Sequence, residues 1–366
     1  MNRALPVVFT LGQEYQIILP VQEEVMMWIQ IGTEIFYDSD NGILRSDKGV
    51  RRVSVPKDLL EREKGYTVFL REVKERKAYF TETKEQVSEY IPFYPVKENA
   101  RAFHIGDVHN HDAAAIQAAK AFGKIDFLIL NGDIPNHCDD LDNIFSIYRI
   151  AAELTRGNVP VVFSRGNHDM RGKYAEHFSR YTPHSNGKFY YTFRLGNIWG
   201  MVLDCGEDKV DEHQEYGNTI CCDDFRRKET EYIKSVIENR DVEYLAPGIT
   251  HRMVISHIPF TKRFEGEFDI AEDIYSEWTR LLREDIKPQL MVCAHEHQFN
   301  IYNPGEREDA YGQPCPVVIG AEVSSASKKL PESYFAGTGL IFEKNSVKVI
   351  FIDSEGVSKN EIFIKF

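Results

Sequence analysis

Between residues 101 and 300 the sequence alternates short apolar runs with segments of helical composition, and this alternation narrows the possible folds more than any other feature. Strong helix formers fill much of the intervening sequence, notably at 113–124, 222–240 and 272–285. Alternating strands and helices predict an α/β core whose sheet faces are covered by helices. Each of five apolar runs ends in a polar cluster, and these runs span residues 100–107, 125–133, 159–169, 251–257 and 289–297.

The flanking regions have the composition of β-structure. Segments 25–32 and 66–73 are rich in β-branched and aromatic residues, and the dipeptide Asn41-Gly42 favours a tight hairpin turn. We expect a small all-β sandwich there, followed by a linker at 94–100, and three further strands within 338–366. The predicted organisation is therefore a β-sandwich domain over residues 1–98 and an α/β domain over residues 101–366.

Charge and composition exclude some classes of partner. The formal net charge is −13 and no stretch is rich in Lys and Arg, so a long nucleic acid is not an expected ligand. No stretch reaches the roughly 18 apolar residues of a membrane helix, and no membrane partner is expected. The six cysteines form no Cys-x-x-Cys pair, which is typical of a reducing compartment, and we expect a cytoplasmic protein.

The polar clusters that follow the five apolar runs contain the residue types that bind metal ions. In open α/β sheets, ligands bind beyond the carboxyl ends of the strands, where these clusters are expected to meet. Imidazole, carboxylate and amide groups are ligands for Zn²⁺, Mn²⁺ or iron, and structural zinc sites usually use cysteines instead. Seven candidates are too many for one tetrahedral site and suit two metal ions with a shared ligand. The candidate ligands are Asp107, His109, Asp133, Asn167, His257, His295 and His297.

The ordered series Asp-x-His, Gly-Asp, Gly-Asn-His-Asp, His and His-x-His resembles the calcineurin-like metallophosphoesterase superfamily, over roughly residues 101–300. The resemblance implies a two-sheet α/β sandwich flanked by helices, with two divalent or mixed-valence metal ions (Mn, Fe or Zn) at one edge. It assigns one metal ion to Asp107, His109 and His297, and the other to Asn167, His257 and His295. Asp133 would bridge the two ions.

The same resemblance implies a phosphoric ester hydrolase, a phosphodiesterase or phosphatase, in which a metal-bridging hydroxide attacks a small phosphoester. His168 would stabilise the phosphoryl group or protonate the departing oxygen, and Asp169 would orient the ring of His168. Arg165 and Arg171 flank the Gly-Asn-His motif and could contact phosphate, although both could equally be solvated. His213 lies in the long polar segment 205–228, which could be a lid over the site or a loop without a role.

Departures from the family pattern keep several alternatives open. The Gly-Asp motif continues to Asn136, where purple acid phosphatases carry an iron-binding tyrosine, so a purple redox-active centre is not expected. The N-terminal region is similar to the fibronectin-like module of plant-type purple acid phosphatases, in which a tyrosine such as Tyr66 braces a corner. The alternative for this N-terminal region is an unrelated all-β appendage.

Three other functions compete with the hydrolase. They are a nuclease of the same superfamily, a non-catalytic scaffold, and an enzyme whose N-terminal module binds a partner or carbohydrate.

Overall fold

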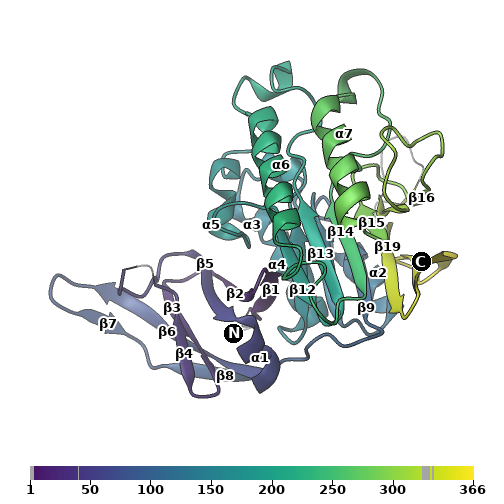
Figure 1. Cartoon of the computed structure of the whole chain (residues 1–366). Coiled ribbons are helices and arrows are strands. Elements are labelled where there is room, and N and C mark those ends of the chain that lie inside the picture. The colour runs from purple at the N-terminus through teal and green to yellow at the C-terminus, as the bar shows by residue number, and fades with distance from the viewer. Residues whose placement is uncertain (1–3, 40, 324–329, 332–333) are drawn as a thin grey trace.

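The computed structural model describes residues 4–39, 41–323, 330–331 and 334–366, and its centre is two β-sheets packed face to face between layers of helices. A third, smaller sheet lies beside this body at the N-terminal end (Figure 1). The predicted two-sheet α/β sandwich flanked by helices, preceded by an all-β region, is thereby confirmed.

The first large sheet is built around three parallel strands that are buried along their whole length or nearly so. These strands, β9 (Arg101–Ile105), β10 (Phe127–Asn131) and β11 (Pro160–Ser164), carry the first three apolar runs, and burial on both faces explains their near-continuous hydrophobicity. Four strands extend the sheet on the β9 side: β18 (Glu322–Val323), β19 (Phe335–Glu343), β20 (Ser346–Asp353) and β21 (Ser358–Lys365). The three strands predicted in the C-terminal tail are β19, β20 and β21.

The second large sheet has the order β12-β13-β14-β15-β17-β16, in which β13, β14, β15 and β17 run parallel. Its strands β14 and β15 carry the last two apolar runs. The bounds are β12 (Tyr191–Leu195), β13 (Ile198–Leu203), β14 (His251–Ser256), β15 (Leu290–Cys293), β16 (Asn300–Tyr302) and β17 (Val317–Ile319).

Helices cover the outer faces of both large sheets. Buried alanines of α2 (Asp112–Phe122) and isoleucines of α4 (Ser146–Thr155) pack on the first sheet, whereas α6 (Cys222–Glu238) and α7 (Glu272–Leu281) cover the second (Figure 1). The three predicted helices correspond to α2, α6 and α7, and a π-helical turn η5 (Leu282–Ile286) continues α7. The short helices are α3 (Leu141–Ile144), η1 (His168–Met170), η2 (Ala175–His177), α5 (Phe178–Tyr181), η3 (Gln214–Tyr216) and η4 (Gly266–Phe268). None of the helices among the described residues is long and apolar enough to cross a membrane.

The N-terminal strands are divided between two sheets. The small third sheet has the order β4-β3-β6-β7, with β8 also paired to β6, whereas β1 pairs in parallel with β11 and continues the first large sheet through β2 and β5. Hydrogen bonding therefore crosses the predicted boundary between residues 98 and 101, and the division into two domains stays a prediction. The bounds are β1 (Val7–Leu11), β2 (Glu14–Val21), β3 (Val25–Ile31), β4 (Glu34–Tyr37), β5 (Gly49–Pro56), α1 (Lys57–Glu63), β6 (Gly65–Arg76), β7 (Thr81–Thr83) and β8 (Val87–Pro92).

Two local predictions in this region were wrong. The strands on either side of Asn41-Gly42 do not form a hairpin, because β4 pairs with β3 while all eight residues of β5 pair with β2. The buried Tyr66 does not brace a corner of its own sheet, because its hydroxyl donates to the carbonyl of Gly157 at 3.0 Å. That hydrogen bond joins the third sheet to the turn between α4 and β11.

Candidate metal centre

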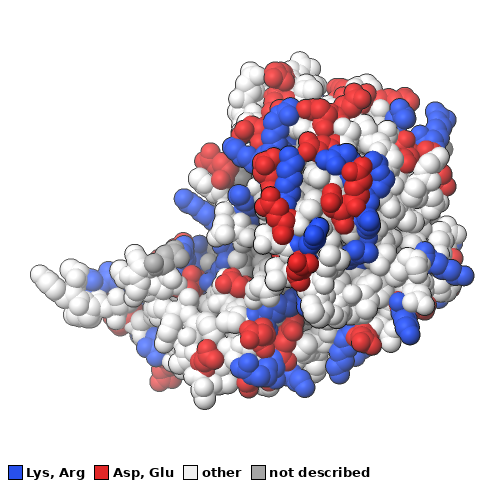
Figure 2. Space-filling view, in the orientation of Figure 1, with Lys and Arg blue, Asp and Glu red and all other residues white. Residues whose placement is uncertain are grey.

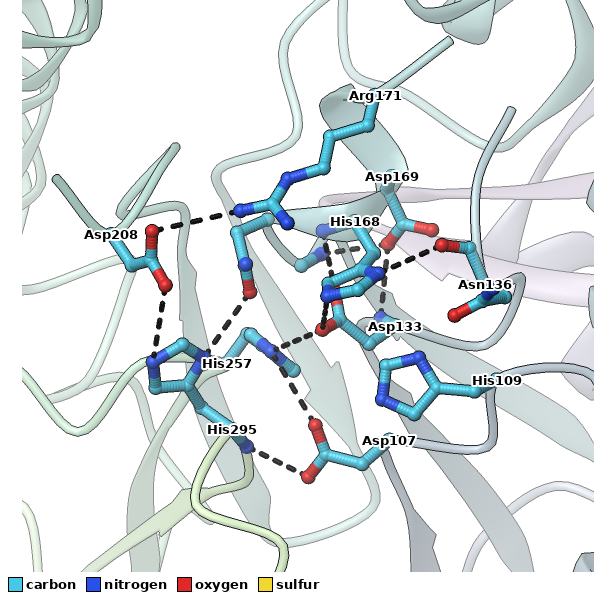
Figure 3. Close-up of polar contacts among 12 residues, drawn as sticks. Asp107, His109, Asp133, Asn136, His168, Asp169, Arg171, Asp208, His257 and His295 are labelled. Atoms are coloured by element: carbon cyan, nitrogen blue, oxygen red, sulfur yellow. Dashed lines mark hydrogen bonds and ion pairs between the residues drawn. The ribbon is translucent and has the colours of Figure 1, made fainter. Parts of the chain in front are cut away.

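The five motifs converge where the carboxyl ends of parallel strands meet. The loops after β9, β10 and β11 come from the first large sheet, and those after β14 and β15 come from the second (Figure 3). Potential ligand atoms lie within 4.8 Å of one another in three groups, namely Asp107-His109-His297, His109-Asp133-His168 and Asp133-His257-His295. Because His109 and Asp133 each belong to two groups, the three groups form one continuous centre.

Asp133 and Asp107 lie at the middle of this centre. The Nε2 atom of His257 is 3.2 Å from Asp133 Oδ2 and 3.7 Å from Asp107 Oδ1. On the other side, His297 Nε2 lies 3.6 Å from Asp107 Oδ1 and 3.0 Å from His109 Nε2. The carbonyl of Asn131 accepts from His257 Nδ1 at 2.8 Å, which directs Nε2 toward the carboxylates.

The side-chain amide of Asn167 lies among the groups of the centre. One of its two polar atoms lies 3.2 Å from His295 Nδ1, 3.3 Å from His257 Nε2 and 3.2 Å from Asp133 Oδ2, and the other faces the guanidinium of Arg171. Hydrogen bonding favours the orientation in which the amide nitrogen donates to the first three atoms and the oxygen accepts from Arg171. A metal ion bound at this position would instead take the amide oxygen as a ligand.

Unpaired polar atoms in the buried part of the centre also fit a cation. Asp107 is fully buried, yet its Oδ1 has no hydrogen-bond partner, and neither does His109 Nδ1. Such atoms normally have partners, and a cation shared by Asp107 Oδ1 and two imidazole nitrogens supplies one. The donor set of carboxylate, imidazole and amide groups suits Zn²⁺, Mn²⁺ or iron.

The centre concentrates charge in a buried place. Burial raises the pKa of Asp107 to about 7, although the positive charge of His257 opposes the rise. Burial acts in the same direction on Asp133, but the charge and hydrogen bond of His257 hold its pKa well below the usual range. Burial lowers the pKa of His257, and the two carboxylates outweigh it and raise that pKa to about 10. In the protein without metal ions, the positive charge of His257 thus partly offsets the negative charges of Asp107 and Asp133. Bound metal cations would take over this role.

The backbone around the centre is strained. Five candidate ligands have left-handed φ values of 47–73°, a conformation that residues other than glycine seldom adopt. A Cβ atom on Gly132 would lie 2.6 Å from the backbone of Gly166 and from the ring of His257, so only glycine lets these loops close. The five strained ligands are Asp107, His109, Asp133, His295 and His297.

His168 lies at the edge of the centre, and a backbone carbonyl orients its ring. Its Nε2 is 4.0 Å from Asp133 Oδ2, and its Nδ1 donates to the carbonyl of Asn136 at 2.7 Å (Figure 3). The predicted partner Asp169 lies elsewhere, since its carboxylate accepts the backbone N–H groups of Gly166 at 2.7 Å and Asp133 at 3.2 Å. Asp169 therefore fixes the loops that carry the centre, and Asn136 takes the orienting role that was predicted for Asp169.

The three predicted substrate contacts have partners within the protein. Arg165 pairs with Asp204 at 2.8 Å, and its guanidinium lies over the rings of Phe189 and Phe225. Arg171 donates two hydrogen bonds to Glu207 and lies 3.6 Å from Asp208. His213 lies 3.2 Å from Glu267. Their contact with substrate stays a prediction.

Asp208 is a residue of the centre that the sequence interpretation missed. Its Oδ2 lies 3.9 Å from His295 Nε2, on the side of the ring opposite Asn167, and it also faces Arg171 (Figure 3). It follows β13, whose apolar run ends in the polar cluster at 204–208 in the same manner as the five runs already recognised. Recognising β13 as a sixth strand followed by a polar cluster would have identified Asp208 from the sequence.

The chain is similar to one family model and to several solved structures. The family model described as calcineurin-like phosphoesterase matches residues 100–299, and no curated protein matches the chain significantly. Purple acid phosphatase PPD1 from yellow lupin (Lupinus luteus) seeds has a TM-score of 0.62 at 13% identity, covering 98% of this chain and 74% of that one, which shows a common fold. The protein TT1561 of Thermus thermophilus is 12% identical with a TM-score of 0.38, covering 73% of this chain and 98% of that one.

The family match contains all five motifs that form the centre, and it spans more than half of the 366 residues. The His and Asp groups are consistent with the dinuclear metal site that is typical of this family. The chain therefore belongs to the calcineurin-like phosphoesterase family.

Proposed function

We propose that this protein is a dinuclear-metal hydrolase that cleaves a small phosphoester, either a diester or a monoester. The observation that carries the proposal is the convergence of the five motifs, whose potential ligand atoms lie within 4.8 Å of one another in three groups linked by His109 and Asp133. Asp107, His109 and His297 would hold one ion and Asn167, His257 and His295 the other, with Asp133 shared.

The protein groups around the two ions have separate roles in this proposal. Two bound metal ions would supply a nucleophilic hydroxide near neutral pH and neutralise charge on the phosphoryl oxygens. His168 presents Nε2 to the centre while its Nδ1 donates to the carbonyl of Asn136, so in its imidazolium form it can donate a proton or a hydrogen bond from Nε2 to the phosphoryl group or the departing oxygen. Asp208 would orient His295 through the nitrogen that faces away from Asn167.

A neighbouring cavity supports a small-molecule substrate. It has a volume of about 700 Å³, within the range of ligand pockets. Its lining includes Met170, Arg171 and Gly172, which follow shortly after Asn167 and His168 in the chain. The aromatic residues that line it are Phe189, Tyr216 and Phe225. We infer that the group leaving the phosphorus atom occupies this cavity.

The nuclease alternative has weaker support. Figure 2 shows acidic and basic side chains interspersed over α6 and α7, and several of them pair within a helix, such as Arg227 with Asp223 and Lys228 with Asp224. A nuclease should bind DNA with an affinity that falls steeply as salt rises, because binding releases counterions from the phosphates. Affinity of that kind in a filter-binding assay would favour the nuclease.

Hydrolysis of bis- and mono-p-nitrophenyl phosphate in the presence of Mn²⁺ tests the proposal. His168→Ala should lose about 10²–10³-fold in turnover, the usual loss when one transition-state donor is removed, and should keep its metal ions. His177→Ala, which removes a half-buried histidine of η2 whose ion pair is with Glu176, is the matched control and should keep wild-type turnover. Wild-type turnover by His168→Ala, or no turnover by the wild-type protein with any metal ion, would contradict the proposal.

A further inference from the structure

The loop after β9 runs beside the loop after β10, and backbone hydrogen bonds join the two loops. The N–H of His109 donates to the carbonyl of Asp133 at 3.0 Å. The N–H of the next residue, Asn110, donates to the carbonyl of Ile134, also at 3.0 Å. Asn110 therefore lies directly after a candidate metal ligand, in a segment that is held against the neighbouring loop of the centre.

The side chain of Asn110 adds two hydrogen bonds to this arrangement. Its Oδ1 accepts the N–H of Asn136 at 2.8 Å, and its Nδ2 donates to the carbonyl of Asn143 in α3 at 3.2 Å. The residue is half-buried, and its φ of 66° is left-handed, a conformation that asparagine adopts more often than most other residues. Asparagine thus suits both the backbone conformation and the hydrogen bonds at this position.

Asn136 connects Asn110 to His168 through its backbone. Its N–H is held by Asn110, and its carbonyl accepts from His168 Nδ1 at 2.7 Å (Figure 3). Asn136 is exposed, so burial of its own side chain contributes little to its position. The hydrogen bond from Asn110 therefore helps to fix the residue whose carbonyl orients the imidazole of His168.

The ring of His168 has few other contacts that could fix its direction. Its edge packs against the ring of His109, with the centroids 4.7 Å apart and an angle of 70° between the ring planes. The side chain of His168 is 28% exposed, so solvent surrounds part of the ring. The direction of Nε2, which lies 4.0 Å from Asp133 Oδ2, therefore depends on the hydrogen bond that Nδ1 makes with Asn136.

We propose that Asn110 is a positioning residue of the hydrolase, which acts through Asn136 to direct Nε2 of His168 toward the metal centre. This inference rests on the proposed function, in which His168 is the proton or hydrogen-bond donor. Both side-chain hydrogen bonds of Asn110 are made to backbone groups, and neither involves a candidate metal ligand. Removing the side chain should therefore disturb the donor and leave the metal ions in place.

Steady-state hydrolysis of the p-nitrophenyl esters by Asn110→Gly tests the role of this side chain. Glycine keeps the left-handed backbone and removes the acceptor for the N–H of Asn136. We expect kcat to fall about 10–100-fold, because a misdirected donor reaches the transition state less often, with little change in KM or metal content. Asn99→Gly, at an exposed asparagine whose φ is 57°, is the matched control and should keep the wild-type kcat.

The double variant Asn110→Gly/His168→Ala separates positioning from a general effect on the structure. If Asn110 acts through His168, Asn110→Gly should change kcat little in the His168→Ala background, where the ring that it positions is missing. An equal fold-loss in both backgrounds, or loss of the metal ions from Asn110→Gly, would overturn the positioning role.

The outcomes also distinguish this inference from the proposed function. A full kcat in Asn110→Gly, together with a large loss in His168→Ala, would overturn only the role of Asn110. Absence of turnover in the wild-type protein, or wild-type turnover by His168→Ala, would contradict the proposed function and this inference with it.

Discussion

Lys57 is a buried cation at the start of α1, and replacing it with methionine should stabilise the protein at neutral pH. The residue is 7% exposed, and its Nζ has no hydrogen-bond partner. The ring of Tyr15, with its centroid 5.3 Å from Nζ, is the nearby aromatic group. Methionine retains the unbranched chain without the charge, so the packing of the side chain should change little.

The size of the effect follows from the pKa of Lys57. Burial lowers this pKa from 10.5 to about 8, and Glu61 opposes the shift. That difference corresponds to a free energy of about 3 kcal/mol. Below pH 8, Lys57 is charged in both the folded and the unfolded chain, so the folded state carries the full free-energy cost of the buried charge. As pH rises from 8 to 10.5, Lys57 loses its proton in the folded protein before it does so in the unfolded chain, and this cost disappears.

Urea unfolding at pH 6.5 and at pH 10 measures this difference. Lys57→Met should be more stable than wild type by up to about 3 kcal/mol at pH 6.5, and the gap should shrink strongly by pH 10. Lys124→Met, at an exposed position, should change stability little at either pH. A Lys57→Met protein no more stable than wild type at pH 6.5, or a gap that does not vary with pH, would refute the reasoning.

Two further substitutions test other parts of the structure. Tyr66→Phe removes the hydrogen bond to the buried carbonyl of Gly157 and should lower the free energy of unfolding by about 1–3 kcal/mol, measured by urea unfolding; an unchanged midpoint would contradict that contact. Gly132→Ala places a methyl group 2.6 Å from the backbone of Gly166 and should abolish tight metal binding, measured by metal analysis after dialysis. Wild-type metal content in Gly132→Ala would contradict the close packing of these loops.

Much of the centre was predictable because each candidate ligand follows a strand that is recognisable in the sequence. The apolar runs ending near Asp107, Asp133 and His257 belong to parallel strands, and parallel strands bring their carboxyl ends to one edge. The order of these strands along the chain was therefore enough to predict that residues distant in the sequence lie close together. The same reasoning applied to β13 would have added Asp208.

Other features depended on contacts that residue types do not encode. The ring of His168 is oriented by the backbone carbonyl of Asn136, and any residue at that position offers the same carbonyl, so the side chain of Asp169 was the natural but wrong partner. The pairing of β1 with β11 joins segments some 150 residues apart, and no turn or linker signal indicates it. Nothing in the sequence indicates that Arg171 pairs with Glu207, which lies 36 residues further along the chain.

Metal content of the purified chain tests the central claim most directly. Elemental analysis of the wild-type protein, after equilibration with Mn²⁺, Zn²⁺ or Fe²⁺ and removal of free metal, should find close to two ions per chain, because two sets of ligands share Asp133. Asp133→Asn should retain markedly fewer. A wild-type protein that holds no metal under any of these conditions would contradict the assignment of the centre and, with it, the proposed hydrolase.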